Sequence, residues 1–435
     1  MTAADISKEP VTLTSPLAVT WYGRTAHAMP ERPEMQGEVE TDIAILGAGF
    51  TGLSAALELA SRGYRVRVLE ARRVGFGASG RNGGQIVTGQ NASMAKLDKL
   101  VGREDADRLW HLAEEAKRLV AERVERHEID CDLKWGYLFA ALKPRHVTEL
   151  DSMVEEWAGR FGYQGLKRLD AEETRHLCAS PRYIAGLRDD GAGHLHPLNY
   201  ALGLARAAEA AGAVIHEHSA VTSVDTGAQP GFTTANGRVR AKYLIIAGNA
   251  LLGQLVPAMA RKIAPVGTYM VSTAPLGARL DALMPEDIAV CDLNNALSYT
   301  RRANDGRLLF GSRVSYTGRP PANLRQQMRR SLDRVFPQLA DVAIEDCWGG
   351  MIDITVNRLP HLGRLSPTAY FAQGFSGHGV SITGIAGKVI AEAVAGTAER
   401  FDVFAHIPHE IFPGGPLRIP TLVLARTWFR ILDML

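Results

Sequence analysis

A glycine-rich stretch near the start of the chain has the residue types and spacing that bind a phosphate. Residues 47–52 read Gly-Ala-Gly-Phe-Thr-Gly, the pattern GxGxxG, and directly follow the apolar run 42–46. The first glycine permits a tight turn, the second lets the backbone approach a pyrophosphate, and the third lets a helix pack closely on a strand. Glu70 ends a second strand-like run, 65–70, where a carboxylate would accept hydrogen bonds from ribose hydroxyls. Together these residues predict a dinucleotide site, and the acidic residue argues against NADP.

Two later glycine clusters bear on which dinucleotide binds, because NAD and FAD share the first pattern. Residues 75–85, Gly-Phe-Gly-Ala-Ser-Gly-Arg-Asn-Gly-Gly-Gln, could bring backbone N–H groups, Ser79 and Arg81 to another part of a long cofactor. Residues 374–379, Gly-Phe-Ser-Gly-His-Gly, precede a helical pattern, and a helix N-terminus can stabilise negative charge that develops on a ring. The alternatives are a flexible loop for 75–85 and a packed histidine for His378. We interpret the clusters as favouring FAD.

The periodicity of the apolar residues predicts the elements that must position these clusters. A strand at 42–46, a helix closed by Gly63 and a strand at 65–70 form a βαβ unit. A long charged helix is expected at 104–128 and an antiparallel sheet over 263–317. Further helices and strands are expected at 200–211, 212–218, 242–247, 369–372 and 380–390. The alternation of parallel-type units with inserted segments predicts a discontinuous, two-domain α/β chain.

The composition excludes several classes of protein. The 435 residues carry a formal charge of +2, which gives no basis for a nucleic-acid surface. The four cysteines form no CxxC pair, and the pairs His194/His196 and His216/His218 have no third ligand at a diagnostic spacing. We therefore predict neither a disulfide framework nor a metal site. The chain has no secretory signal and no uninterrupted apolar span of eighteen residues, so we expect a soluble cytoplasmic protein.

On these motifs the chain resembles the FAD-dependent amine and D-amino acid oxidase (DAO) superfamily, which includes sarcosine and glycine oxidases. The resemblance covers nearly the whole chain through the segments 47–52 with Glu70, 75–85, 194–197, 244–248 and 374–379. Within the superfamily, GASGRNGGQ, HLHPLNYALGLARAAEAAG and WGGMIDITVNRLPHLGR are most similar to the γ-glutamylputrescine oxidoreductase-like branch. The resemblance implies an α/β fold in which a Rossmann-like FAD-binding domain of the DAO type is interleaved with an α+β substrate domain built on an antiparallel sheet.

The expected domain boundaries divide the chain into four parts. We expect an N-terminal arm laid over the surface (1–40), an FAD-binding domain (41–95, 186–262 and 346–400), a substrate domain (96–185 and 263–345) and a C-terminal tail (401–435). The tail contains a basic amphipathic helical pattern at 422–432. This helix can pack on the body or a sister subunit, which we favour, or contact a membrane surface.

The resemblance also implies roles in FAD binding. The first turn and its neighbours would surround the pyrophosphate and adenosine: Gly47, Gly49, Phe50, Thr51, Gly52, Glu70, Ala71, Arg72 and, through its backbone, Val221. The second loop would run along the pyrophosphate and ribityl chain: Ser79, Arg81, Asn82, Gly84 and Gln85. The third would face the pyrimidine end of the flavin: Gly377, His378, Gly379 and Val380. His378 and Gln85 are the flavin-facing candidates, and no residue is assigned as a catalytic base.

Some relatives attach flavin to a cysteine shortly before the last glycine motif, but Cys347 lies several residues too early, so we expect noncovalent FAD.

For the reaction, the resemblance implies oxidation of the C–N bond of an amine or amino acid, such as a γ-glutamylputrescine-like amine or an N-alkyl amino acid. Hydride would pass from the carbon of a neutral amine to flavin N5, and the imine would hydrolyse to an aldehyde or keto acid. Because an arginine fork suits a carboxylate, the candidate substrate anchors are Tyr299, Arg301, Arg313 and Arg358. Each can instead be structural, and Arg358 has the strongest case.

Three questions stay open at this point. The electron acceptor is oxygen or another molecule: some sarcosine-oxidising relatives place a lysine beside the flavin to activate oxygen, and residues 279–319 contain none. An NAD-linked dehydrogenase would explain residues 47–70 but would leave the later glycine clusters without a role. The chain could also be a non-catalytic FAD-binding component of a larger assembly.

Overall fold

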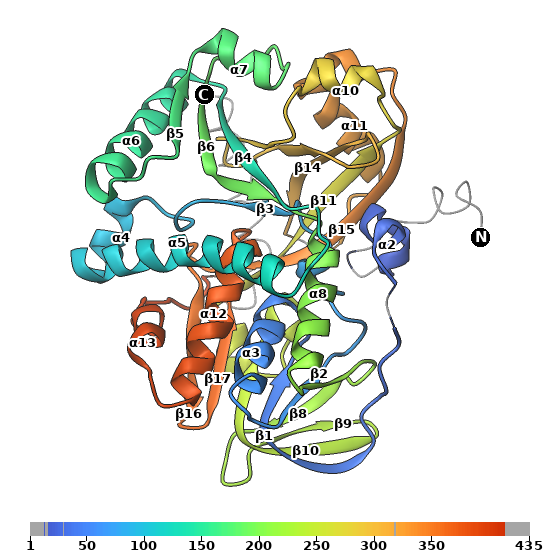
Figure 1. Cartoon of the computed structure of the whole chain (residues 1–435), viewed down its shortest axis with the longest axis vertical. Coiled ribbons are helices and arrows are strands. Elements are labelled where there is room, and N and C mark those ends of the chain that lie inside the picture. Colours follow the sequence, from blue (N-terminus) through green and yellow to red (C-terminus); the bar gives the residue numbers. More distant parts are fainter. Residues whose placement is uncertain (1–12, 14–15, 29, 317–318, 414–435) are drawn as a thin grey trace.

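The computed structural model describes residues 13, 16–28, 30–316 and 319–413, which form two β-sheets with helices packed around them (Figure 1). The strands of the eight-stranded sheet are β1 (Gly37–Leu46), β2 (Val66–Leu69), β7 (Val214–His216), β8 (Val221–Asp225), β9 (Gly231–Thr234), β10 (Gly237–Ile246), β16 (His361–Ser366) and β17 (Ala369–Gln373). The strands of the nine-stranded sheet are β3 (Gln85–Ile86), β4 (Lys134–Ala141), β5 (Leu166–Leu169), β6 (Ala185–His194), β11 (Ala264–Thr273), β12 (Ala289–Asp292), β13 (Tyr299–Arg302), β14 (Leu308–Ser315) and β15 (Ile344–Ile354). The α-helices are α2 (Trp21–Thr25), α3 (Phe50–Ala60), α4 (Met94–Val101), α5 (Arg103–Arg126), α6 (Pro144–Phe161), α7 (Ala171–Leu177), α8 (Pro197–Ala210), α9 (Pro257–Ala260), α10 (Ala278–Leu283), α11 (Leu324–Val335), α12 (Gly379–Val394) and α13 (Glu399–Ala405). The 3₁₀ helices are η1 (Leu17–Val19), η2 (Ala78–Gly80), η3 (Asn249–Leu252) and η4 (Pro337–Leu339).

The eight-stranded sheet has the parallel core of a Rossmann-like fold. Its order is β16-β17-β10-β1-β2-β7, and the pairs from β17 through to β7 are parallel. In β1, Ile43, Ala44 and Ile45 are fully buried, as expected of a strand covered on both faces. Ile43 and Ile45 belong to the hydrophobic cluster that holds α3 and α12, whereas Ala44 belongs to a separate cluster with Met259. The fold class predicted from the sequence is confirmed.

Helix α3 forms where the apolar spacing predicts it. It buries Leu53, Ala56 and Leu57 against the sheet. Beyond its end Gly63 adopts a left-handed φ of +85°, and the N–H of Tyr64 donates to the carbonyl of Leu59 over 3.1 Å. The predicted βαβ unit is therefore confirmed, with Gly63 as the residue that turns the chain out of the helix.

The nine-stranded sheet is mainly antiparallel. Its order is β15-β11-β14-β13-β12-β4-β6-β3, with β5 beside β6, and β12 and β4 form a parallel pair. A second hydrophobic cluster packs this sheet against α10 and α11 through residues such as Leu280 and Leu332. The region 263–317 forms β11 to β14 as predicted, although the short helix α10 interrupts it.

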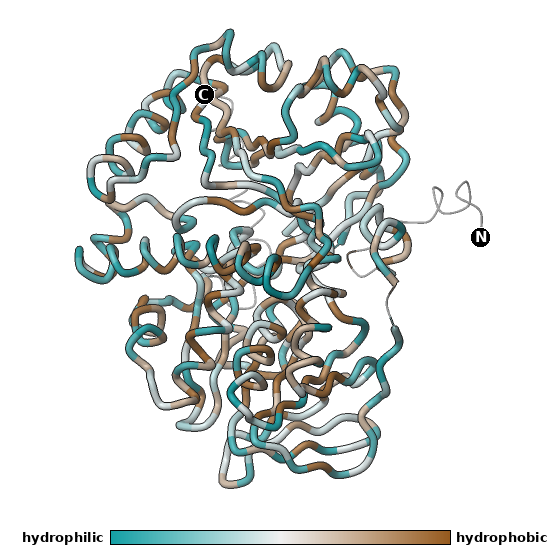
Figure 2. The backbone as a smooth tube through the Cα atoms, viewed as in Figure 1, coloured by the Kyte–Doolittle hydropathy of each residue, from teal (hydrophilic) through white to brown (hydrophobic). Residues whose placement is uncertain are grey.

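The two sheets occupy opposite halves of the molecule. Figure 1 shows the eight-stranded sheet with α3, α8 and α12 in the lower half, the nine-stranded sheet in the upper half, and α5 crossing between them. Helix α5 matches the long charged helix predicted at 104–128. In Figure 2 the coils of α3 and α12 contain much brown, the hydrophobic colour, whereas α5 mixes teal with brown. These colours agree with burial of α3 and α12 on most sides and of α5 on one face.

Sheet membership differs from the expected division of the chain at three strands. β3, β6 and β15 lie within or at the edges of ranges predicted for the FAD-binding domain, but they pair in the nine-stranded sheet. Periodicity cannot tell a strand of one sheet from a strand of its neighbour, because the spacing of residues within a strand does not record which sheet the strand joins. The division into two domains stays a prediction, which the strand pairing adjusts at these places.

The two ends of the chain also bear on the predictions. Within the predicted arm 1–40, the described residues 16–28 and 30–40 do not simply lie over the surface, because Trp21 and Tyr22 of α2 are buried and residues 37–40 begin β1. The helix predicted at 422–432 lies outside the described residues. No helix in residues 16–28, 30–316 or 319–413 combines the length and hydropathy that crossing a bilayer requires.

Candidate active site

The turn between β1 and α3 is built so that only glycine fits at two of its positions. Gly47 has a φ of +101°, and a Cβ added there would lie 2.8 Å from the carbonyl oxygen of Ala247 at the end of β10. A Cβ on Gly52 would lie 1.9 Å from the carbonyl oxygen of Gly47. Gly49 precedes α3 and supplies no capping side chain, so the helix N-terminus keeps donors suited to an anion.

Glu70 holds this turn from the end of the neighbouring strand. Its Oε2 accepts the Ala48 N–H over 2.9 Å, and its Oε1 accepts the Arg72 N–H over 2.9 Å. Burial raises the pKa of the Glu70 carboxyl, although the backbone donors oppose that shift. Ala71 and Arg72 are exposed, and Val221 packs in the same hydrophobic cluster as Leu69. The predicted adenosine residues therefore gather at the carboxyl ends of β1 and β2.

The loop 75–85 connects the first turn to the nine-stranded sheet. Ser79 Oγ accepts the Phe50 N–H over 3.0 Å, and the side chain of Asn82 donates to Ala78 and Ser79 while its oxygen accepts the Gly84 N–H. Arg81 is buried, its Nε donates to the Phe76 carbonyl over 2.7 Å, and burial lowers the pKa of its guanidinium to about 10.

The far end of this loop is bound to three strands of the nine-stranded sheet, β15, β4 and β12. The carbonyl of Arg81 accepts Nε1–H of Trp348 on β15 over 3.1 Å. Gln85 reaches further into the sheet: its Oε1 accepts the Tyr137 hydroxyl over 3.0 Å, and its Nε2 donates to the Val290 carbonyl over 3.2 Å. The loop therefore spans the junction between the two halves of the molecule.

The third glycine cluster lies at the start of α12. Gly374 has a left-handed φ of +76°, and its N–H donates to Asp353 Oδ2 over 2.9 Å. The N–H of Ser376 donates to the carbonyl of Asp353 over 3.0 Å. His378 precedes the helix, and its Nε2 lies 2.9 Å from the Gly89 carbonyl, so Nε2 carries the proton. Burial lowers the pKa of His378 to about 4, so the ring is neutral at pH 7.

Asp353 is a residue of this region that sequence reasoning missed. It is buried, and burial raises the pKa of its carboxyl to about 6. Its bonds to Gly374 and Ser376 show that it holds the third cluster from β15. No sequence signal could have paired it with residues more than twenty positions later, because a single acid in a β-strand has no distinctive spacing.

The structure separates the four candidate substrate anchors. The ring of Tyr299 packs between the backbones of two glycines. A Cβ added to Gly83 would lie 2.6 Å from the ring, and one added to Gly311 would lie 2.0 Å from it. Arg301 is 1% exposed and all three of its guanidinium nitrogens are bonded to protein atoms, so the structure does not leave it for a substrate carboxylate. Arg313 lies in β14, but its side chain is outside the described part of the chain.

Arg358 has surroundings that differ from those of Arg301. It adopts a left-handed φ of +69° in the turn between β15 and β16 and is partly exposed. Burial and the charge of Arg358 together lower the pKa of Lys96, whose Nζ donates to the Asn357 carbonyl over 2.7 Å. Lys96 is a second cation that the sequence did not reveal, because it is more than 250 positions away in the chain.

The fold and these glycine clusters define the class of protein. Residues 42–393 match the model of the FAD dependent oxidoreductase (DAO) family, and the chain belongs to this family. It is therefore an FAD-dependent oxidoreductase, which confirms the predicted cofactor and excludes the NAD-linked alternative. The described residues fit FAD. Ser79 joins the second cluster to the first, and β15 contacts both the second cluster through Trp348 and the third through Asp353. The clusters also have backbone positions where a side chain would not fit.

Particular relatives can be named beyond the family. The chain is 40% identical to γ-glutamylputrescine oxidoreductase of Escherichia coli K12 over 419 residues, which cover 96% of this chain and 98% of that protein. It is 42% identical to a probable oxidoreductase of Haemophilus influenzae over 369 residues, 83% of this chain and 85% of that one. Glycine oxidase from Geobacillus kaustophilus has a similar fold, with a TM-score of 0.71 and 23% identity over 82% of this chain and 95% of that chain.

Proposed function

We propose that this enzyme oxidises the C–N bond of an amine or amino acid to an imine, which hydrolyses to an aldehyde or keto acid. The observation that carries the proposal is the 40% identity to γ-glutamylputrescine oxidoreductase over nearly the full length of both proteins. We therefore propose a γ-glutamylated amine or a related amine as the substrate. FAD, when bound, would supply the redox chemistry by accepting a hydride, with the two electrons of the C–H bond next to the amine nitrogen.

In this proposal the three glycine clusters hold successive parts of FAD. The turn before α3, with Glu70, Ala71, Arg72 and Val221, binds the pyrophosphate and adenosine. The loop from Ser79 to Gln85 follows the cofactor toward the flavin, and residues 377–380 face its pyrimidine end. The direct bonds from Ser79 to the first turn and from Trp348 to the loop support this order.

We propose that FAD is held without a covalent bond to Cys347. Cys347 is buried in the hydrophobic cluster of the nine-stranded sheet, and burial raises the pKa of its thiol to about 11. Neighbouring residues on a strand point to opposite faces of the sheet. Because Trp348 points toward Arg81, the side chain of Cys347 points away from the loop that we assign to FAD.

No side chain of the described site has the properties of a strong base at neutral pH. His378 is neutral but directs its Nε2 proton to the Gly89 carbonyl, and Asp353 is committed to the backbone of the third cluster. We propose that these residues orient and hold rather than abstract a proton. The substrate must then bind as a neutral amine, because a protonated nitrogen has no lone pair to feed into the forming imine.

For the substrate carboxylate we propose Arg358, assisted by Lys96, as the anchor. The two cations lie close enough for the charge of Arg358 to lower the pKa of Lys96. A planar guanidinium can bind a carboxylate through two parallel hydrogen bonds. Tyr299 would line the substrate site from β13.

An anaerobic stopped-flow screen tests the proposed reaction. The purified holoenzyme is mixed with polyamines, γ-glutamylated amines, N-methyl amino acids, D-amino acids and aminophosphonates. We expect at least one amine to bleach the oxidised flavin, with γ-glutamylated amines the fastest. Flavin that stays oxidised with the whole panel would contradict the proposal.

The electron acceptor and the location complete the proposal. We propose that oxygen or another acceptor reoxidises the enzyme; rapid reoxidation of the bleached enzyme by air-saturated buffer would identify oxygen. A cytoplasmic location is supported by Cys131, Cys178, Cys291 and Cys347, which are free thiols, as in proteins of a reducing compartment.

A further inference from the structure

A short segment near the N-terminus is inserted between the two halves of the molecule. Thr20 caps α2, its Oγ1 accepting the Gly23 N–H over 2.9 Å, and a Cβ on Gly23 would lie 2.0 Å from the Leu17 carbonyl oxygen. The tight turn directs Trp21 and Tyr22 inward, where they are 1% and 0% exposed. This segment lies before residue 42, the first residue that matches the family model.

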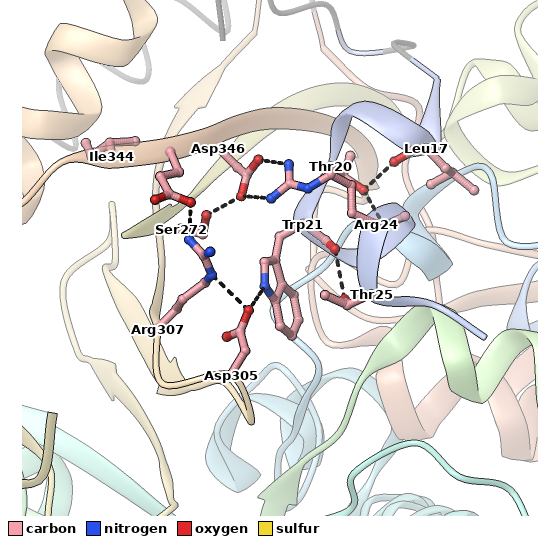
Figure 3. Close-up of polar contacts among 12 residues, drawn as sticks. Leu17, Thr20, Trp21, Arg24, Thr25, Ser272, Asp305, Arg307, Ile344 and Asp346 are labelled. Atoms are coloured by element: carbon pink, nitrogen blue, oxygen red, sulfur yellow. Dashed lines mark hydrogen bonds and ion pairs between the residues drawn. The ribbon is translucent and has the colours of Figure 1, made fainter. Parts of the chain in front are cut away.

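The segment is fastened to the nine-stranded sheet on its outer side. Figure 3 shows Arg24 paired with Asp346 of β15, and Trp21 Nε1 donating to Asp305 Oδ2 over 2.9 Å. Asp346 also accepts the Ser272 hydroxyl, and Asp305 accepts Arg307 Nε over 2.8 Å. Because these anchors come from three different strands or loops, α2 has a defined position against the sheet.

On its inner side, Tyr22 contacts a buried arginine that holds the predicted FAD loop. The Tyr22 hydroxyl accepts Nη2–H of Arg301 over 3.3 Å. Arg301 Nε donates to the carbonyl of Gly83 over 2.9 Å, and Nη1 donates to the carbonyl of Arg302 over 3.0 Å. Gly83 lies between Asn82 and Gly84, in the part of the loop nearest the flavin in our proposal. A forked guanidinium thus connects Tyr22 to the loop backbone.

A second chain of contacts leads from the same segment, through His196 and Leu195, to Gly84, the next residue of the loop. His196 Nδ1 accepts the Asn199 N–H over 3.1 Å, so its proton is on Nε2, which donates to Thr25 Oγ1 over 3.0 Å. Leu195, next to His196, donates its N–H to the carbonyl of Gly84 over 2.9 Å. A Cβ on Gly84 would lie 2.0 Å from the Leu195 carbonyl, so the loop and this strand end lie in direct contact.

We propose that Tyr22 is a positioning residue for FAD: through Arg301 it sets the place of Gly83 and Gly84, and hence of the loop along the flavin. This inference rests on the proposed course of FAD along residues 79–85. It assigns Arg301 to positioning the cofactor loop rather than to binding the substrate. Removal of the Tyr22 hydroxyl leaves a buried guanidinium donor without its acceptor, and the loop bonded to that guanidinium can then shift.

The test compares Tyr22→Phe with a matched control, Tyr183→Phe, which removes a hydroxyl from an equally buried tyrosine in the hydrophobic cluster of α10 and α11. Three quantities are measured without any amine: the dissociation constant for FAD, the visible circular dichroism of the bound flavin and the thermal midpoint of the apoprotein. For Tyr22→Phe we expect the FAD dissociation constant to rise about 3- to 10-fold. We also expect the visible dichroism of the bound flavin to change. The thermal midpoint of the Tyr22→Phe apoprotein should be similar to that of the Tyr183→Phe apoprotein.

A second variant shows whether Tyr22 acts through Arg301. Arg301→Lys keeps the charge, but its compact ammonium lacks the planar fork whose three nitrogens separately bond Gly83, Arg302 and Tyr22. We expect the FAD affinity of the double variant Tyr22→Phe/Arg301→Lys to equal that of Arg301→Lys alone. Wild-type affinity and dichroism in Tyr22→Phe, or losses that add in the double variant, would overturn the inference. Because no substrate is used, this outcome is independent of the amine screen.

Discussion

At the scale of single residues, two carboxylates, the half-buried Glu70 and the buried Asp353, have comparable tasks at the two ends of the proposed FAD site. Glu70 accepts the N–H groups of Ala48 and Arg72, and Asp353 accepts the N–H of Gly374. Each carboxylate thus stabilises a glycine turn by accepting hydrogen bonds from its backbone. A carboxylate oxygen can accept more than one hydrogen bond, so Glu70 can also accept a ribose hydroxyl.

Glu70→Gln is expected to weaken FAD binding about tenfold, because the amide NH₂ cannot accept a backbone N–H and one of the two bonds is lost. Flavin fluorescence titration of the apoprotein measures this change. The control is Glu217→Gln, another buried carboxylate, which accepts the Val74 N–H over 2.8 Å and pairs with Arg73. Equal FAD affinities for both variants would count against the role of Glu70.

Arg358→Gln is expected to lower kcat/KM about 10- to 100-fold for amines that carry a carboxylate, through KM more than kcat, because a charge-assisted pair is lost. Amines without a carboxylate should be affected far less. Steady-state kinetics with one substrate of each kind measures the difference. Arg364→Gln is the control, because it removes an arginine of β16 that is paired with Asp402 of α13. A similar loss for both kinds of amine would remove Arg358 as the anchor.

At the scale of elements, the site depends on how closely α12 approaches α3. Ser54 Oγ of α3 donates to the carbonyl of Gly384 over 2.6 Å, and a Cβ on Gly387 would lie 2.5 Å from the Thr51 carbonyl oxygen. Each helix begins at a glycine cluster of the proposed FAD site. Their separation therefore sets the distance between the pyrophosphate end and the flavin end.

Two glycines of α12 allow a matched test of this packing. Gly387→Ala is expected to destabilise the protein by about 1–3 kcal/mol and to weaken FAD binding, because the methyl group meets backbone. Gly384→Ala gains the same helix propensity, but its Cβ would meet side chains rather than backbone, Arg123 at 3.3 Å and Leu119 at 3.9 Å. Thermal unfolding with and without FAD compares the two. If the two variants were equally stable, the result would contradict the close approach of α3 and α12.

The elements also show where periodicity succeeds and where it fails. Helix α5 was predicted within two residues at each end, because a 24-residue amphipathic pattern is unambiguous. Helix α2 has five residues, too few to show a period, and was assigned to a surface arm. Its burial depends on Arg24, Asp305 and Asp346, which come together only in the folded chain.

At the scale of the whole molecule, buried histidines make stability depend on pH. Burial lowers the pKa to about 3 for His196 and His361 and to about 4 for His378 and His409. Below pH 6.5 the unfolded chain binds protons that these rings exclude in the folded state, so the histidines make unfolding easier as the pH falls toward 4. Asp353 acts in the opposite direction, because its raised pKa of about 6 favours the protonated, folded state as the pH falls below 6.

His361→Gln is therefore expected to reduce the loss of thermal stability between pH 6.5 and 4. His361 and His409 lie with ring centroids 4.4 Å apart, and His361 Nδ1 accepts Gln373 Nε2–H over 3.0 Å, so the first ring has no place for a second proton. The thermal midpoint is followed across pH in excess FAD. His176→Gln, on the exposed side of α7, is the control. If the thermal midpoint of His361→Gln fell with pH as steeply as that of the wild type, His361 would not be a source of the acid sensitivity.

The sequence by itself determined the cofactor class, the βαβ unit and the three glycine clusters. These features depend on local geometry: a turn that excludes a Cβ and a helix that begins on it can be recognised from neighbouring residues. The resemblance carried by these motifs extended the prediction to the family, which the match over residues 42–393 confirmed.

The tertiary structure decided what depends on contacts between distant segments. It brought Tyr22 to Arg301 and Gly83, Asp353 to Gly374, and Lys96 to the neighbourhood of Arg358. Such contacts leave no periodic or spacing signal, because a single polar residue acquires its partner only when the sheets and helices pack.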